Sequence, residues 1–144
     1  MDRNSQMIII ISSPSGAGKT SICKKLLEYD KSLSISISDT TRVPRDNERN
    51  GKDYNFIDEA KFKKRIANNE YIEYATVFGN LYGSLHTNVK NLLNSGFDVL
   101  FDIDWQGAKQ LKSSEYRNIL SFFIVPPSKE AIFSRLQERA KSSG

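Results

Sequence analysis

The feature that most constrains the fold is a glycine-rich run that directly follows a short stretch of isoleucines. Residues 7–11 form a continuous apolar run, which is typical of a strand buried on both faces of a parallel sheet. After the glycine-rich run, Ile22, Leu26 and Leu27 recur at helical spacing between Thr20 and Tyr29. Strand, loop and helix in this order are the first half of a βαβ unit, so the chain is expected to build an α/β fold on a parallel sheet.

The glycine-rich run has the spacing of the phosphate-binding motif G-x-x-x-x-G-K-[ST], known as the P-loop. In that motif backbone N–H groups surround phosphate oxygens, the lysine reaches the outer phosphates and the hydroxyl residue ligates Mg²⁺. Lys19 and Thr20 occupy the last two positions, and Ser13 replaces the first glycine. The run predicts a nucleoside triphosphate site made of Ser13, Pro14, Ser15, Gly16, Ala17, Gly18, Lys19 and Thr20.

The rest of the chain alternates between strand and helix patterns. Expected strands are 33–38, where leucine and isoleucines alternate with serines, 71–78, 99–104, and a further buried strand at 119–125. Expected helices follow Asp58, precede Gly96, and run from Ser128 to about residue 140. Residues 42–52 read as a polar, arginine-rich loop.

Composition narrows the class of protein. The 144 residues fit one domain, and no stretch approaches the roughly 20 apolar residues of a membrane span. The net charge of +4 comes without a long basic run, and small phosphorylated ligands explain it as well as nucleic acid does. The single cysteine, Cys23, agrees with a reducing compartment, and we expect a cytoplasmic protein that binds neither membrane nor nucleic acid.

A GTPase and a kinase differ in what accompanies a P-loop. A GTPase needs an Asn-Lys-x-Asp motif to read the base, and the nearest run, 88–91, lacks both the order and the carboxylate. A kinase needs a second site with cations for the phosphate of the acceptor. The chain offers arginines for such a site, which favours a kinase.

Several runs beyond the P-loop resemble the acceptor site of guanylate kinases, in the order found in that family. They are Ser38-Asp39-Thr40-Thr41-Arg42-Val43-Pro44-Arg45, Gly51-Lys52-Asp53-Tyr54-Asn55-Phe56, Tyr71-Ile72-Glu73, Tyr82-Gly83-Ser84 and Asp102-Ile103-Asp104-Trp105-Gln106-Gly107. The resemblance extends from about residue 7 to residue 140. It implies phosphoryl transfer from ATP to GMP, with Mg²⁺ as cofactor.

The resemblance also implies roles for individual side chains. The residues matching those that hold the GMP phosphate are Arg42, Arg45, Tyr54 and Tyr82, and those matching the guanine contacts are Ser38, Glu73, Ser84 and Asp102. Guanidinium forks suit phosphate. A carboxylate at Glu73 accepts from the N1–H and 2-amino group of guanine, whereas adenine offers neither donor, so base choice is expected to depend on Glu73.

The donor side follows from the same resemblance. Lys19, Arg42, Arg135 and Arg139 are the expected catalytic cations, the last two matching arginines of a lid that closes over the site. Thr20 is expected to ligate Mg²⁺, with Asp102 and Asp104 as further candidates through bound water. Trp105, beside these acids, is expected to pack.

The implied organisation is a single guanylate-kinase-like domain over residues 1–144. It comprises a P-loop core at 7–32, a small mixed β/α GMP-binding insertion at 33–96, core strands at 97–127 and the start of a lid at 128–144, in a parallel sheet covered by helices. Family members continue further, so we expect a C-terminally truncated chain whose exposed sheet edge could favour self-association. A GMP-binding fragment without activity and a guanylate-kinase-like protein-interaction module remain alternatives to the kinase.

Overall fold

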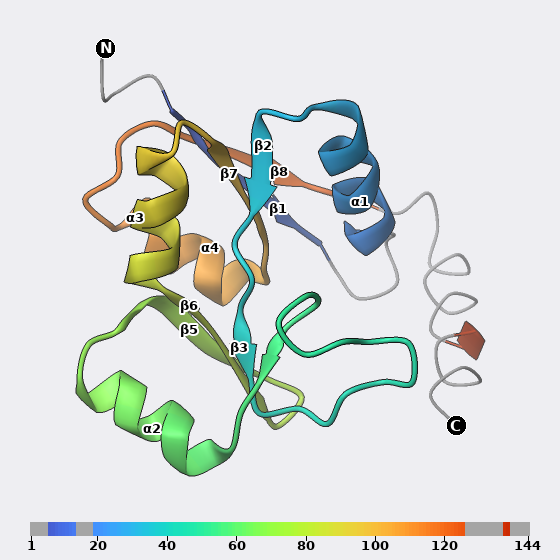
Figure 1. Ribbon diagram of the computed structural model, residues 1–144, viewed down its shortest axis with the longest axis vertical. Helices are drawn as coiled ribbons and strands as arrows, with labels where there is room; N and C mark the ends of the chain where they lie inside the picture. Colours follow the sequence, from blue (N-terminus) through green and yellow to red (C-terminus); the bar gives the residue numbers. More distant parts are fainter. Residues whose placement is uncertain (1–5, 14–18, 126–136, 139–144) are drawn as a thin grey trace.

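Two four-stranded sheets form the protein in the computed structural model, which describes residues 6–13, 19–125 and 137–138 (Figure 1). The first sheet has the strand order β2-β7-β1-β8, and all of its pairings are parallel. Its strands are β1 (Ile8–Ser12), β2 (Leu33–Ile35), β7 (Asp98–Asp102) and β8 (Ile119–Phe123). Strand β1 lies between β7 and β8, as expected for the apolar run 7–11.

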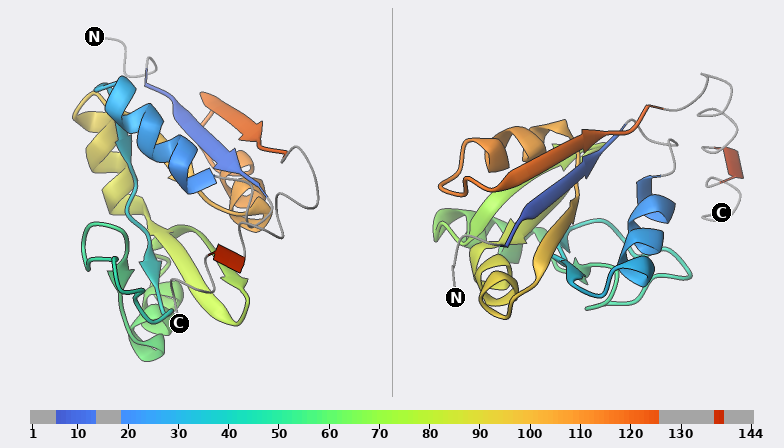
Figure 2. Two further views of the ribbon diagram at one scale, coloured as in Figure 1. Left: turned by 90° about the vertical axis from the view of Figure 1, so that its right-hand side faces the viewer. Right: turned by 90° about the horizontal axis from the view of Figure 1, so that it is seen from above.

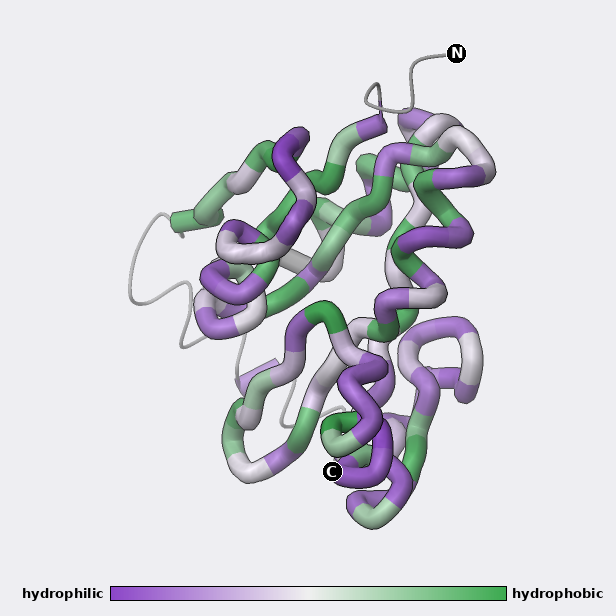
Figure 3. Tube along the Cα trace, turned by 90° about the vertical axis from the view of Figure 1, so that its left-hand side faces the viewer, coloured by the Kyte–Doolittle hydropathy of each residue, from purple (hydrophilic) through white to green (hydrophobic). Residues whose placement is uncertain are grey.

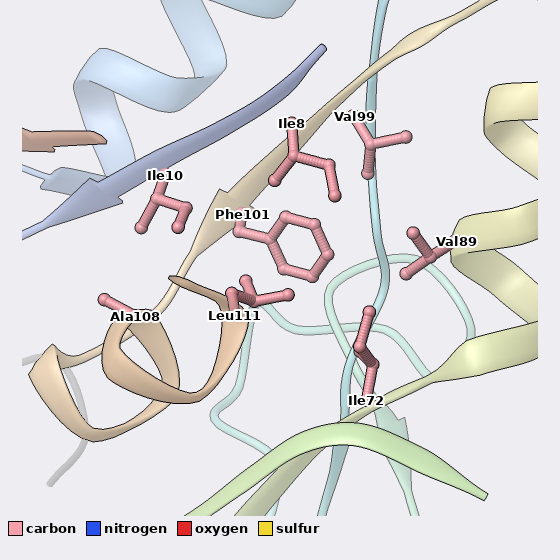
Figure 4. Packing of buried hydrophobic residues seen from close by; sticks show 8 residues of the cluster. All are labelled: Ile8, Ile10, Ile72, Val89, Val99, Phe101, Ala108 and Leu111. Atoms are coloured by element: carbon pink, nitrogen blue, oxygen red, sulfur yellow. The ribbon is translucent and has the colours of Figure 1, made fainter. Parts of the chain in front are cut away.

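Helices cover both faces of the first sheet. Helix α1 (Lys19–Tyr29) packs on one face, and α3 (His86–Asn94) and α4 (Trp105–Lys112) lie on the other (Figures 1 and 2). Alternating side chains of the strands divide the core accordingly. Ile8, Ile10, Val99 and Phe101 join Val89, Ala108 and Leu111 toward α3 and α4, and Ile72 of the second sheet completes this cluster (Figure 4). Ile11 and Leu100 pack with Cys23 of α1 on the opposite face.

The second sheet is smaller and has the strand order β4-β3-β6-β5. Its strands are β3 (Asp39–Thr40), β4 (Asn55–Phe56), β5 (Tyr71–Val77) and β6 (Asn80–Leu85), with helix α2 (Glu59–Ala67) between β4 and β5. Strands β5 and β6 form an antiparallel hairpin, whose turn is made by Phe78 and by Gly79 at φ +80°. Hydrophobic residues are concentrated along the first sheet, whereas α2 is mostly hydrophilic (Figure 3).

Local signals in the sequence explain where several helices begin and end. Asp58 accepts a hydrogen bond from the backbone of Lys61 at the start of α2, as expected. Gly96 follows α3 with φ +91°, a left-handed conformation that favours glycine. Within the described part of the chain, no helix combines the length and apolarity that a bilayer crossing needs.

Three expectations need correction, and two elements of the structure had no expected counterpart. The strand expected at 33–38 ends at Ile35, because the chain then leaves the first sheet to enter β3. Strand β6 and helix α4 were not expected from the sequence. Strand β8 is the edge of the first sheet rather than a buried strand, and Phe122 and Phe123 are 51% and 62% exposed. Trp105 is exposed rather than packed. The helix expected from Ser128 lies outside the described residues, apart from helical residues 137–138.

Candidate active site

The carboxyl ends of β1 and β7 bring the start of the P-loop next to an acidic residue. Ile11 and Asp102 are register partners, and the backbone N–H of Ile103 donates to the carbonyl oxygen of Ile11 at 3.3 Å. Ser13 follows β1, and Thr20 is exposed in the first turn of α1. The expected site residues Pro14–Gly18 and the side chain of Lys19 lie outside the described part. This sheet edge is where parallel α/β proteins bind ligands.

Arg42 is the centre of a polar cluster on the second sheet. Its Nε donates to the hydroxyl of Tyr82 at 3.2 Å, and its two terminal nitrogens donate to the two carboxylate oxygens of Glu48, both at 2.9 Å. The guanidinium carbon also lies 5.4 Å from the ring centroid of Tyr54. Hydrogen bonding to the Glu48 carboxylate raises the pKa of Arg42 above its ordinary value, so the cation is permanent. The structure thus brings together three of the four residues expected at the phosphate.

Glu48 is a member of this cluster that the sequence reasoning missed. Its carboxylate also accepts from the backbone N–H of Arg45 at 2.8 Å, so it ties both loop arginines together. Partial burial alone would raise the pKa of Glu48, but the hydrogen bonds from Arg42 and Arg45 outweigh burial and lower it. A carboxylate close in sequence to two arginines of a polar loop was the available signal.

Tyr54 is an aromatic member of the arginine cluster whose hydroxyl has a strongly shifted pKa. Its ring packs edge-on against Tyr82, with centroids 5.8 Å apart. Burial raises the pKa of Tyr54 to about 12, and the negative charge of Asp102 contributes to the rise. Asp102 is also the register partner of Ile11 at the end of β1.

A second polar group is built around Glu73, in the middle of β5. Its side chain is buried, with the whole residue 3% exposed, and its Oε1 accepts from the hydroxyl of Ser84 at 2.6 Å. The hydroxyls of Ser84 and Ser38 are 3.2 Å apart. The structure therefore brings Ser38, Glu73 and Ser84 together from three different strands or their ends, as the guanine assignment requires.

Burial shifts the ionisation of Glu73 into the neutral range. Desolvation raises its pKa to about 7, the charge of Asp104 adds to the rise, and the hydrogen bond from Ser84 opposes it. A buried carboxyl group with a displaced pKa and few partners is a common property of binding sites. Because the group accepts only one described side-chain hydrogen bond, it retains acceptor capacity for a ligand.

Gly107 makes room for this carboxylate, a role that the sequence did not reveal. A Cβ atom at Gly107 would overlap Glu73 Oε2 and would lie 3.1 Å from Ile103 Cδ1. Asp104 begins the same helix as its N-cap, accepting from the backbone of Gly107 at 3.2 Å and from the side chain of Gln106 at 3.0 Å. The N-terminal turn of α4 therefore packs against the side chain of Glu73.

The architecture and the site together define a class of protein. A parallel sheet whose first strand runs into a P-loop, with a small sheet beside it that presents arginine, tyrosine and a buried carboxylate, belongs to the P-loop nucleoside monophosphate kinases. The expected lid residues Arg135 and Arg139 lie outside the described part of the chain.

Comparison with known proteins identifies the family within this class. The family model for guanylate kinase matches residues 5–144. A guanylate kinase of Rickettsia bellii is 50% identical over 140 residues, covering 97% of this chain and 73% of that protein. A guanylate kinase of Paramagnetospirillum magneticum is 46% identical over 137 residues, covering 95% of this chain and 64% of that protein.

A solved structure agrees with the sequence relatives. The crystal structure of guanylate kinase from Anaplasma phagocytophilum superposes with a TM-score of 0.79 at 38% identity, and the match covers 94% of this chain and 69% of that one. The chain belongs to the guanylate kinase family. It spans about two thirds to three quarters of the length of the relatives it matches.

Proposed function

We propose that this chain binds GMP on its second sheet and ATP at its P-loop, and transfers the outer phosphate of ATP to GMP, giving ADP and GDP. The observation that carries the proposal is the buried, hydrogen-bonded Glu73 lying in one small sheet with the Arg42 cluster. One group suits a guanine base and the other suits a phosphate. A nucleoside monophosphate presents both at its two ends.

Guanine recognition is assigned to Glu73 with Ser38 and Ser84. The free lone pairs of the carboxylate would accept from guanine N1–H and the 2-amino group, both of which adenine lacks. An adenine in this position would leave the buried carboxylate opposite another acceptor, which costs far more than the loss of a methyl contact. Selection against adenine therefore comes from the buried charge of Glu73, which would be left unpaired in a complex with AMP.

Phosphate recognition is assigned to Arg42, Arg45, Tyr54 and Tyr82. The guanidinium of Arg42 has five N–H donors in general. Four are directed to Tyr82, the carbonyl of Val43 and the two oxygens of Glu48. One remains for the nucleotide, so Arg42 supplies a fixed direction as well as charge. The tyrosine hydroxyls would add neutral donors.

Binding of ATP and its metal ion is assigned to the P-loop and to the carboxyl ends of β1 and β7 beside it. Thr20 and Asp102 supply hydroxyl and carboxylate oxygens, the donor types that Mg²⁺ prefers, and Asp104 is a further candidate through water. When bound with ATP, Mg²⁺ would neutralise phosphate charge. Lys19 would hold the outer phosphates, and Arg135 and Arg139 would cover the transferring group and exclude water.

No strong general base is required of the protein. The phosphate of GMP is largely ionised at neutral pH, because the second pKa of a phosphate monoester is about 6. What the side chains do is position the acceptor oxygen and balance charge, which can account for most of the acceleration of phosphoryl transfer. Asp102 would contact either the acceptor or the hydration shell of the metal.

The proposal is tested by two measurements on the 144-residue chain. A coupled assay follows ADP formed from ATP in the presence of GMP, with AMP as the matched base control, and calorimetry measures GMP binding alone. We expect GMP-dependent turnover with little or none for AMP. Binding without turnover would leave the GMP-binding fragment as the correct reading, and absence of both would support the interaction module.

A further inference from the structure

The most deeply buried acidic side chain outside the proposed guanine contacts is Asp39, the first residue of β3. It is 0% exposed, and three side chains from three other elements surround its carboxylate. Arg65 of α2 forms an ion pair and hydrogen bond with Oδ2, the hydroxyl of Tyr71 donates to Oδ2 at 2.7 Å, and the amide of Asn55 donates to Oδ1 at 3.1 Å. The group thus joins β3 to β4, β5 and α2.

The position of Asp39 in the chain places this network under the proposed acceptor site. Ser38 precedes it on the guanine side, and Arg42 of the phosphate cluster follows three residues later. Between them, the Thr40 hydroxyl donates to the carbonyl of Leu81 at 2.9 Å, and the Thr41 hydroxyl accepts from the backbone of Leu81 at 2.9 Å. Both threonines between the base contact and the phosphate contact are therefore hydrogen-bonded to Leu81 of β6.

On the neighbouring strand β6, residues of the same two groups again lie on either side of the residue that pairs with Asp39. Asp39 pairs with Gly83. This glycine lies between Tyr82 of the Arg42 cluster and Ser84 of the proposed guanine contacts. A Cβ atom at Gly83 would lie 2.8 Å from the ring of Tyr71, so the glycine leaves the space that this ring occupies. The ring also stacks on Phe62, with centroids 4.6 Å apart. Tyr71 is thereby fixed with its hydroxyl on Asp39.

The ion pair joins the fully buried carboxylate of Asp39 to Arg65, whose side chain is 23% exposed. Stability alone explains it poorly, because removing the carboxylate from water generally costs about as much as its attraction to the cation returns, and well-packed apolar residues often stabilise a fold more. The four elements joined here are those that carry or flank the acceptor residues. A geometric role in that site accounts for the network better.

We infer that Asp39, held by Arg65 and Tyr71, is a positioning residue for the acceptor nucleotide, which fixes the distance between the guanine contacts and the Arg42 cluster. The inference rests on the proposed function, since it concerns how the GMP site is held. Asp39 itself does not touch the nucleotide. Its effect passes through β3 to Ser38 and Arg42 and should leave the P-loop unaffected.

The test measures GMP and ATP affinities separately by calorimetry for the chain and its variants. Asp39→Asn keeps the shape but removes the charge, and we expect it to weaken GMP binding by about tenfold, with ATP affinity within about twofold of the original. Tyr71→Phe removes one hydroxyl and keeps the stacked ring, and should weaken GMP binding by about threefold. Val99→Ala, in the core of the first sheet, is the matched control for lost stability.

The outcomes separate the inference from the function on which it rests. If the unaltered chain binds no GMP, the proposed function fails. If it binds GMP but Tyr71→Phe and Asp39→Asn bind it equally well, the positioning role is wrong. The role is also wrong if Val99→Ala, at an equal loss of melting temperature, weakens GMP binding as much. If Asp39→Asn does not fold, Tyr71→Phe decides alone.

Discussion

The two sheets bury their strands by opposite means. In the first sheet, β1 and β7 are covered on both faces by aliphatic and aromatic side chains, and burial itself stabilises the arrangement. In the second sheet, the buried positions include Asp39, Thr40, Glu73 and Ser84, which are buried only because each finds a hydrogen-bond partner. The first sheet is stabilised by apolar packing, whereas the second sheet buries the polar side chains that we propose contact GMP.

The difference shows where stability has been exchanged for recognition. A buried polar group adds little to folding even when it is fully paired, and it costs free energy when it is not. Glu73 has only one described side-chain partner, and burial has already displaced its pKa. The second sheet therefore holds capacity for hydrogen bonds that GMP is proposed to satisfy.

The sharpest separation of the two regions should come from Lys19→Ala. Loss of the P-loop cation removes charge stabilisation from the transferring phosphate, so turnover should fall by about 100-fold or more. GMP affinity should stay within about twofold, because the proposed acceptor site lies on the other sheet. Assay of turnover beside calorimetry with GMP checks both, and near-normal turnover would refute the proposed role of the P-loop.

Next in size is the effect of pH on stability through Glu73. Its folded-state pKa of about 7 lies above the ordinary 4.5, so its stabilising contribution is complete below that ordinary value and is lost as pH rises through about 7. Relative to Glu73→Gln, the unliganded chain should lose about 3 kcal/mol of unfolding free energy between pH 4.5 and about pH 8.

Urea denaturation at a series of pH values measures this slope. The matched control is Glu70→Gln, which alters an exposed carboxylate directly before β5. This variant should keep the slope of the unaltered protein. Equal slopes for the Glu73 and Glu70 variants would show that the buried carboxyl group does not titrate in this range.

A smaller effect is expected from Glu48→Gln in the phosphate cluster. The amide cannot hold both terminal nitrogens of Arg42 as acceptor, so the guanidinium loses its fixed direction and GMP should bind about tenfold more weakly. Guanosine, which lacks the phosphate, should be unaffected. Glu59→Gln, which breaks an exposed ion pair with Lys63, is the control and should change neither affinity. Tighter GMP binding by Glu48→Gln would mean that Glu48 competes with the phosphate.

The smallest effect is expected from Gly107→Ala, which should destabilise the protein although glycine-to-alanine changes in helices are usually stabilising. Glycine to alanine inside a helix generally stabilises by about 1 kcal/mol. At Gly107 the new methyl group would displace the Glu73 carboxylate, so Gly107→Ala should lower the melting temperature and weaken GMP binding several-fold, on the order of 1 kcal/mol. A stabilised variant with unchanged GMP affinity would contradict the packing described here.

The sequence predicted the first sheet better than the second, for a physical reason. Apolar runs such as 7–11 identify buried strands directly, and the P-loop motif orders strand and helix around it. The second sheet has two-residue strands and polar buried positions, so periodicity did not reveal β6, and the serine alternation of 33–38 suggested a strand that ends at Ile35. Strand β8 looked buried because its composition is apolar, although it lies at the edge of the sheet.

The candidate site shows the same division. Ser38, Arg42, Tyr54, Glu73, Tyr82 and Ser84 were assigned by resemblance, and the structure brings them into two adjoining groups. The residues that hold them were missed, since Glu48, Asp39 and Gly107 act through contacts across the fold that sequence spacing does not encode. Sequence motifs therefore predict the residues that contact a ligand, whereas the residues that hold those contacts in place become visible only in the three-dimensional structure.

Selection of a guanine nucleotide by the second sheet is proposed to depend on Glu73. The most direct measurement is calorimetric titration of the unaltered chain and of Glu73→Gln with GMP and with AMP at about pH 8, where the carboxylate is ionised. We expect the unaltered chain to bind GMP at least about 100-fold more tightly than AMP, and Glu73→Gln to lose most of this ratio. Equal affinity of the unaltered chain for GMP and AMP would contradict it.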